Sequence, residues 1–144
     1  VLAFGTPAIA ACEAADELSS EYRVAVYDAR FAKPVDETLV RSLLSRGIPV
    51  LTIEDHSIVG GFGSAVLECA QEHGLDASRV VRHGIPDHWI LQDSRPDQLK
   101  EVGLDRTGIM RMIRHAADPS AHDRVRVETA NERLPSPTPT TERV

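Results

Sequence analysis

The 144-residue chain has little of what marks several common classes of protein. It has two cysteines, Cys12 and Cys69, so it carries no disulfide framework, and we expect a reducing, cytoplasmic compartment. No apolar run approaches the ~20 residues that span a bilayer, and the start has neither the basic nor the apolar region of a signal peptide. The net charge of −6 argues against a nucleic-acid-binding domain, which is usually basic. We therefore expect neither a membrane nor a nucleic-acid partner.

The chain also lacks an initiator methionine. It begins with the apolar run Val1-Leu2-Ala3-Phe4, which predicts a buried strand at the very first residues. Because a natural protein rarely begins inside its own core, we expect the chain to be part of a longer protein.

Short apolar runs alternate with amphipathic segments over most of the chain. The runs predict strands over 1–5, 23–28, 49–54 and 79–84. Helices are predicted over 7–19 with Thr6 as N-cap, between Asp36 and Gly47, and over 64–73, 96–102 and 106–117, the last capped by Asp105. This alternation is typical of an α/β fold, a three-layer α/β/α arrangement with a mostly parallel sheet. The pattern suits the strand order 2-1-3-4, with a further edge strand expected upstream of Val1.

The composition changes near residue 118. The segment 118–144 is rich in proline, threonine and charged residues, and has few large apolar side chains. Such a segment buries too little surface to offset its ordering entropy. We therefore expect one folded domain over 1–117, followed by a disordered tail over 118–144.

The segment Glu54–Ser64 is the richest in functional groups. It follows the third predicted strand, at the edge of the sheet where ligands bind in open α/β folds. A glycine turn before a helix can bind phosphate through free N–H groups. Alternatively, Glu54 or Asp55 acts as an acid or base with His56. In a third interpretation the carboxylates bond loop amides or a facing subunit, and the glycines permit positive φ, so that Gly61→Val destabilises the domain.

Other site types have less support. None of the six histidines is paired with another at helical spacing, and neither cysteine has a partner at metal-ligand spacing, so we expect no metal site. No Gly-x-Ser-x-Gly motif supports a hydrolase. Arg30 and Lys33 follow the second strand and suit either an anion or an interface salt bridge.

Six motifs together resemble one enzyme family. They are Phe4-Gly5-Thr6, Asp28-Ala29-Arg30-Phe31-Ala32-Lys33-Pro34-Val35-Asp36, Thr52-Ile53-Glu54-Asp55-His56, Gly60-Gly61-Phe62-Gly63-Ser64-Ala65-Val66, Gly84-Ile85-Pro86-Asp87, and Gly103-Leu104-Asp105 followed by Gly108-Ile109. Their order and spacing resemble the C-terminal, transketolase-like domain of the 1-deoxy-D-xylulose-5-phosphate synthases. The resemblance covers residues 1–117.

The resemblance implies a transferase that condenses pyruvate with glyceraldehyde 3-phosphate, with loss of carbon dioxide. Such enzymes use thiamine diphosphate and Mg²⁺, act as homodimers of three-domain chains, and supply isoprenoid (terpenoid) and thiamine biosynthesis. The cofactor and the metal are bound by the two upstream domains, and this chain has no Gly-Asp-Gly motif for them. We therefore expect no catalytic, cofactor-binding or metal-binding residue here, and no activity of the fragment alone.

By the same resemblance, the domain serves dimerisation and contacts its own upstream domains. The candidate interface residues are Glu54, Asp55, His56, Gly60, Gly61, Gly63, Arg30 and Asp87. Two alternatives stay open. One is the equivalent domain of a transketolase or of a 2-oxo-acid dehydrogenase E1 β chain. The other is a free-standing α/β module that binds a phosphorylated ligand at the glycine turn.

Overall fold

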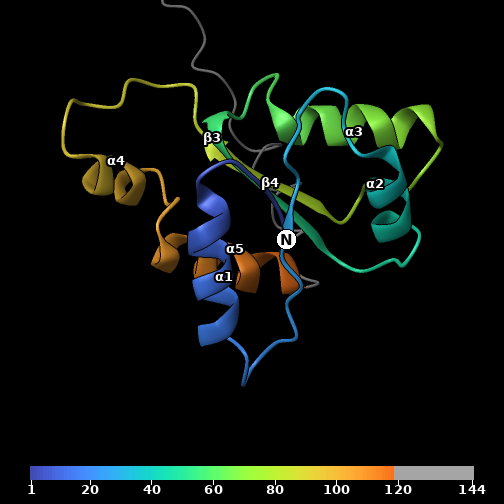
Figure 1. Ribbon diagram of the computed structural model, residues 1–144, viewed down its shortest axis with the longest axis horizontal. Coiled ribbons are helices and arrows are strands. Elements are labelled where there is room, and N and C mark those ends of the chain that lie inside the picture. Colours follow the sequence, from blue (N-terminus) through green and yellow to red (C-terminus); the bar gives the residue numbers. More distant parts are fainter. Residues whose placement is uncertain (119–144) are drawn as a thin grey trace, which may run out of the picture.

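A computed structural model describes residues 1–118 of the chain. The strands are β1 (Leu2–Phe4), β2 (Tyr27–Asp28), β3 (Val50–Ser57) and β4 (Val80–Ile85), and the helices are α1 (Pro7–Glu17), α2 (Glu37–Leu44), α3 (Phe62–Glu72), α4 (Arg95–Glu101) and α5 (Arg106–Ala117). The strands form one parallel sheet in the order β2-β1-β3-β4. Helices α1 and α5 cover one face, and α2 and α3 the other (Figure 1). The predicted three-layer α/β/α fold is confirmed, and the strand order is the one that the sequence pattern suits.

Two apolar cores flank the sheet because neighbouring residues of a strand point to opposite faces. Leu2 joins Val66 and Phe62 of α3 in the core on one face. Ala3 joins Ile109 and Ile113 of α5 in the core on the other. With both faces covered, the strands are continuous apolar runs, as parallel sheets require. None of the described helices is long and apolar enough to cross a membrane.

Two of the three predicted capping side chains, Asp36 and Asp105, start their helices as expected. The N–H of Leu39 donates to Asp36 (N···Oδ1 2.9 Å), and the N–H of Gly108 donates to Asp105 (N···Oδ1 2.9 Å). The predicted side-chain cap at Thr6 is wrong, because its hydroxyl donates instead to Asp55 (Oγ1···Oδ2 3.0 Å). That bond ties the start of α1 to the end of β3.

The second strand is much shorter than predicted. The expected strand over 23–28 is reduced to Tyr27–Asp28, because β1 pairs Leu2 with Tyr27 and offers no further paired residues to the segment before it. The third strand is longer than predicted and continues past Glu54 to Ser57, with an irregularity in its register against β4. The predicted tail over 118–144 lies, from residue 119 on, outside the described residues.

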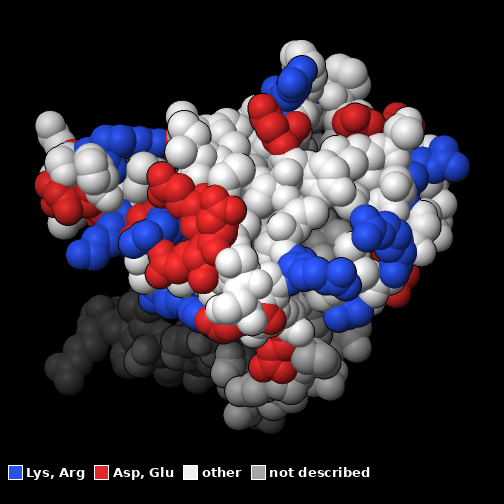
Figure 2. Space-filling view, turned by 60° about the horizontal axis from the view of Figure 1, so that its bottom comes forward, with Lys and Arg blue, Asp and Glu red and all other residues white. Residues whose placement is uncertain are grey.

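The outer side of α1 is acidic and is tied to α5 by ion pairs. Arg106 binds Glu17 (2.7 Å), and Arg114 donates two hydrogen bonds to Glu21 (Nη2···Oε1 2.8 Å, Nε···Oε2 3.2 Å). The hydrogen bonds from Arg114 lower the pKa of the Glu21 carboxyl. Figure 2 shows acidic side chains gathered beside basic ones on this side of the molecule. Exposed pairs of this kind stabilise little, and these two join α1 and the turn after it to α5.

Candidate functional site

The glycine turn lies over the carboxyl end of β3 and is built around Glu54. The Glu54 side chain is completely buried. Its two oxygens accept the N–H groups of Phe62 (N···Oε2 2.5 Å) and Gly63 (N···Oε1 2.9 Å), the first residues of α3. Free N–H groups at a helix start carry partial positive charge, so a carboxylate there is well placed. Glu54 therefore joins β3 to α3 from inside the domain.

The glycines around Glu54 are required mainly by close contact. A Cβ atom on Gly61 would lie 2.7 Å from the Glu54 carboxyl carbon, and one on Gly84 would lie 2.8 Å from Glu54 Cγ. Gly61 has φ −86°, so the predicted need for positive φ at Gly61 is wrong; its small size is what the site requires. Gly60, with φ +70° and open space around it, is the glycine that the turn needs for its backbone conformation.

Asp55 has a separate role beside Glu54. It accepts the Thr6 hydroxyl and forms an ion pair with Arg95, the first residue of α4. Its side chain is mostly shielded, at 14% exposure. This contact fixes the loop that precedes α4 against β3 and the start of α1. Arg95 was missed by the sequence analysis, because no local pattern links it to a residue forty positions earlier.

The remaining candidates do not join this cluster. His56 is exposed, and its ring contacts only the carbonyl of Ser57 (Nδ1···O 3.5 Å) among the hydrogen bonds of the described residues. Arg30 is exposed in the loop after β2, where its N–H donates to Asp28 (N···Oδ1 3.0 Å). Asp87 is exposed in the loop after β4. The eight predicted site residues thus divide into a structural group around the buried Glu54 and three separate exposed positions.

This geometry limits the chemistry of the turn. Both Glu54 oxygens are held by backbone N–H groups, and the ring of the exposed His56 contacts the Ser57 carbonyl instead, so the pair is not arranged for acid–base catalysis. The N–H groups that would bind a phosphate are the ones that Glu54 already occupies. Within residues 1–118, no three His, Cys, Asp or Glu side chains come together as a metal site would need.

The edge of the sheet at the carboxyl ends of the strands exposes several large apolar side chains. Phe31 (65% exposed), Val59 (66%), Trp89 (94%) and Leu91 (77%) lie in the loops after β2, β3 and β4. These loops follow the same end of the sheet (Figure 1). We call these four residues the carboxyl-end surface. In the sequence, this surface could have been found from large apolar residues that stand in polar loops and fit neither a helix nor a strand pattern.

Comparison with known proteins agrees with the fold. Residues 1–109 match the family model described as "Transketolase, C-terminal domain". The chain belongs to the transketolase C-terminal domain family. The 1-deoxy-D-xylulose-5-phosphate synthase of Bacillus velezensis is 41% identical over 123 residues, which are 85% of this chain and 19% of that protein. The enzyme of the same name from Bacillus licheniformis is 44% identical over 115 residues, 79% of this chain and 18% of that protein.

A solved structure is also similar. It is titled "Split gene transketolase, inactive beta4 tetramer", with 30% sequence identity and a TM-score of 0.67. The match covers 81% of this chain and 37% of that one. The chain thus spans about a fifth of the length of the curated relatives it matches. The resemblance stated from the six sequence motifs is confirmed at the level of the domain family.

Proposed function

We propose that this chain forms the C-terminal domain of an enzyme of the 1-deoxy-D-xylulose-5-phosphate synthase type. The support is its 41–44% identity to synthases of that name over most of the folded part. The whole enzyme would be a cytoplasmic homodimer that condenses pyruvate with glyceraldehyde 3-phosphate. A transketolase is the alternative enzyme type, and the lower identity of 30% to the split transketolase disfavours it.

Thiamine diphosphate and Mg²⁺ do not fit the described residues of this chain. The helix start that could bind a diphosphate is occupied by Glu54, and these residues form no metal-ligand cluster. We assign both groups to upstream domains, so this domain contributes no cofactor ligand. The same occupancy disfavours the alternative of a free-standing module that binds a phosphorylated ligand at residues 60–63.

The role of the domain is to hold its neighbours through the carboxyl-end surface. This proposal depends on one observation, the exposure of Phe31, Val59, Trp89 and Leu91 on three successive loops. Large apolar side chains exposed on loops at one end of a sheet mark a candidate protein interface. Arg30, His56 and Asp87 are exposed in or next to the same loops and would form the polar rim. The related split transketolase is described as a tetramer, which agrees with a domain that takes part in assembly.

A domain exchange tests this function. Residues 1–117 replace the matching part of the Bacillus licheniformis synthase, and product formation from pyruvate and glyceraldehyde 3-phosphate is measured with thiamine diphosphate and Mg²⁺. We expect an active dimer, whereas the isolated chain neither turns over the substrates nor binds thiamine diphosphate saturably. A chimaera of native mass without activity, or an isolated chain with micromolar affinity for the cofactor, would refute the proposal.

The docking role is tested within the same chimaera. The double variant Trp89→Ser/Leu91→Ser removes two of the four apolar contacts, so we expect weaker assembly in sedimentation and a loss of activity that higher protein concentration restores. The control variant Gln71→Ser changes an exposed side chain at the far end of α3 and should behave as the parent. Equal assembly of the two variants would show that other residues hold the neighbours.

A further inference from the structure

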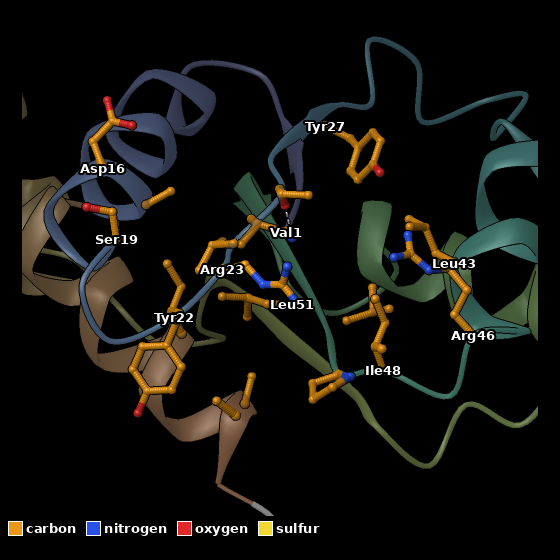
Figure 3. Close-up of a pocket in the computed structure, with 18 residues that line it drawn as sticks. Val1, Asp16, Ser19, Tyr22, Arg23, Tyr27, Leu43, Arg46, Ile48 and Leu51 are labelled. Atoms are coloured by element: carbon orange, nitrogen blue, oxygen red, sulfur yellow. Dashed lines mark hydrogen bonds between the residues drawn. The ribbon is translucent and has the colours of Figure 1, made fainter.

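The segment 86–102 follows β4 and contains α4, at the carboxyl end of the sheet (Figure 1). We call this segment the arm. A pocket of about 830 Å³ lies at the other end of the sheet, where it surrounds Val1 between Tyr22 and Ile48 (Figure 3). None of the residues that line this pocket belongs to the arm, so the arm is a separate feature of the domain.

The arm projects from the domain and is held by little packing. None of the residues of α4 (Arg95–Glu101) is buried, and Figure 1 shows this helix standing apart from α1 and α5. Trp89 and Leu91, which belong to the carboxyl-end surface, are almost entirely in solvent. A segment that buries so little apolar surface is not fixed by its core contacts. Its position therefore depends on polar contacts.

The two roots of the arm are attached close together on β4. At one root, the N–H of Ile58 donates to the carbonyl of Ile85, the last residue of β4 (2.9 Å). At the other root, the ring Nε2 of His83 lies 2.9 Å from the carbonyl oxygen of Gly103, the residue after the arm. His83 and Ile85 are neighbours but one on the same strand. Two attachment points so close together define an axis about which the arm could turn.

Hydrogen bonds within the arm preserve its own shape. Ser94 caps α4 by accepting the N–H of Asp97 (N···Oγ 3.4 Å). The side chain of Gln98 donates to the carbonyl of Leu91 (Nε2···O 3.1 Å). These bonds join α4 to the loop that carries Trp89 and Leu91, so the arm would turn as one unit and take both apolar side chains with it.

One ion pair holds the arm at a third point. Among the hydrogen bonds and ion pairs of residues 1–118, the pair of Arg95 with Asp55 alone ties the inside of the arm to the sheet. Asp55 lies on β3, and the Thr6 hydroxyl that it accepts (3.0 Å) holds its carboxylate in place. Because Arg95 lies in the middle of the arm, away from both roots, this contact stops the arm from turning.

We propose that Asp55 and Arg95 are positioning residues of the carboxyl-end surface, whose ion pair holds the arm where Trp89 and Leu91 meet a neighbouring domain or subunit. The inference rests on the proposed function, because it assigns the pair to docking. A surface whose apolar side chains are already in place loses less conformational entropy on binding. Asp55, predicted as an interface residue, then acts through Arg95 and not by touching the partner.

The pair could instead serve the stability of the fold alone, and a second ion pair separates the two roles. Arg106 binds Glu17 (2.7 Å), and its side chain is 54% exposed, the same fraction as that of Arg95. Pairs with such exposure stabilise a fold little. Arg106 lies on α5, outside the arm, so its replacement removes a comparable pair without freeing the arm.

The first measurement follows the position of the arm in the full 144-residue chain. Spin labels are attached to the exposed Cys12 and to Gln92→Cys, while the buried Cys69 stays unlabelled. The distribution of distances between the labels is recorded by pulsed electron resonance in frozen solution. We expect Arg95→Met to make this distribution about twofold broader, and the control Arg106→Met to leave it unchanged.

The second measurement follows assembly of the chimaera described above, by sedimentation. We expect Arg95→Met to raise the Kd of assembly about tenfold, because the freed arm must be ordered on binding. Arg106→Met should assemble as the parent does, although the two variants have the same Tm. Arg95→Lys retains the positive charge and should recover most of the affinity.

An unchanged distance distribution in Arg95→Met, or equal assembly of Arg95→Met and Arg106→Met, would overturn the proposal. A much lower Tm for Arg95→Met than for Arg106→Met would also overturn it, since the pair would then be structural. The Trp89→Ser/Leu91→Ser variant distinguishes this failure from that of the proposed function. If it assembles weakly while Arg95→Met assembles as the parent, the positioning role alone is refuted. If both assemble as the parent, the docking role of the carboxyl-end surface is refuted as well.

Discussion

Glu54→Gln should destabilise the domain although it changes one buried atom. In the native structure two oxygens accept two N–H groups at the start of α3. The glutamine amide keeps one acceptor and turns an NH₂ group toward the second N–H, which has no water to bond because the side chain is completely buried. Losing one charge-assisted hydrogen bond and leaving a donor unpaired costs about 2 kcal/mol. Glu54→Ala loses both bonds and leaves a cavity, so about 4 kcal/mol is expected.

The assay is urea unfolding of the full chain followed by far-ultraviolet circular dichroism, with the free energy extrapolated to water. Glu68→Gln is the matched control, because Glu68 is exposed on the same helix and its change should stay within ~0.5 kcal/mol. If Glu54→Gln matched that control, Glu54 would not hold α3, and its burial would need a functional explanation.

Three further results are expected. Gly61→Ala should lower the free energy of unfolding more than Gly60→Ala, because the first substitution forces a Cβ into the Glu54 carboxylate. Gly60→Ala costs only the ~1–2 kcal/mol of holding a non-glycine residue at positive φ. Equal losses of stability would contradict this. A thiol reagent should label the exposed Cys12 in the folded chain but Cys69 only on unfolding, because burial raises the pKa of the Cys69 thiol; equal labelling rates would be inconsistent. Burial lowers the pKa of the Val1 amine from 8.0 to about 6, so the unfolded chain binds more protons and stability should rise by about 2 kcal/mol from pH 6 to 8, a gain that N-terminal acetylation removes. An identical pH profile after acetylation would exclude this cause.

Local patterns predicted the elements that depend on local interactions. Apolar runs located all four strands, and Asp36 and Asp105 cap helices as expected. Thr6 failed as a cap because its hydroxyl has a better partner in Asp55, which arrives from a distant part of the chain. The length of the second strand was overestimated. A segment forms a strand only where a neighbouring strand pairs with it, and the apolar composition of the segment does not reveal how long that neighbour is.

At the candidate site, too, local features could be predicted from the sequence and long-range contacts could not. The sequence indicated that Glu54 and the glycine turn belong together, but it left phosphate binding, acid–base chemistry and internal hydrogen bonding open. Only the fold distinguishes them, because it brings the carboxylate to the two N–H groups of the helix start. The ion pair of Asp55 with Arg95 and the exposure of Trp89 likewise depend on how distant loops are arranged.

Trp89 gives the protein a built-in optical probe. It is the single tryptophan of the chain, and its indole is almost entirely in water while the domain is folded. Its fluorescence should therefore change little when the domain unfolds, but should shift to the blue when another protein surface covers the loop after β4. Emission from this one side chain would follow the assembly of the domain with its neighbours separately from its folding.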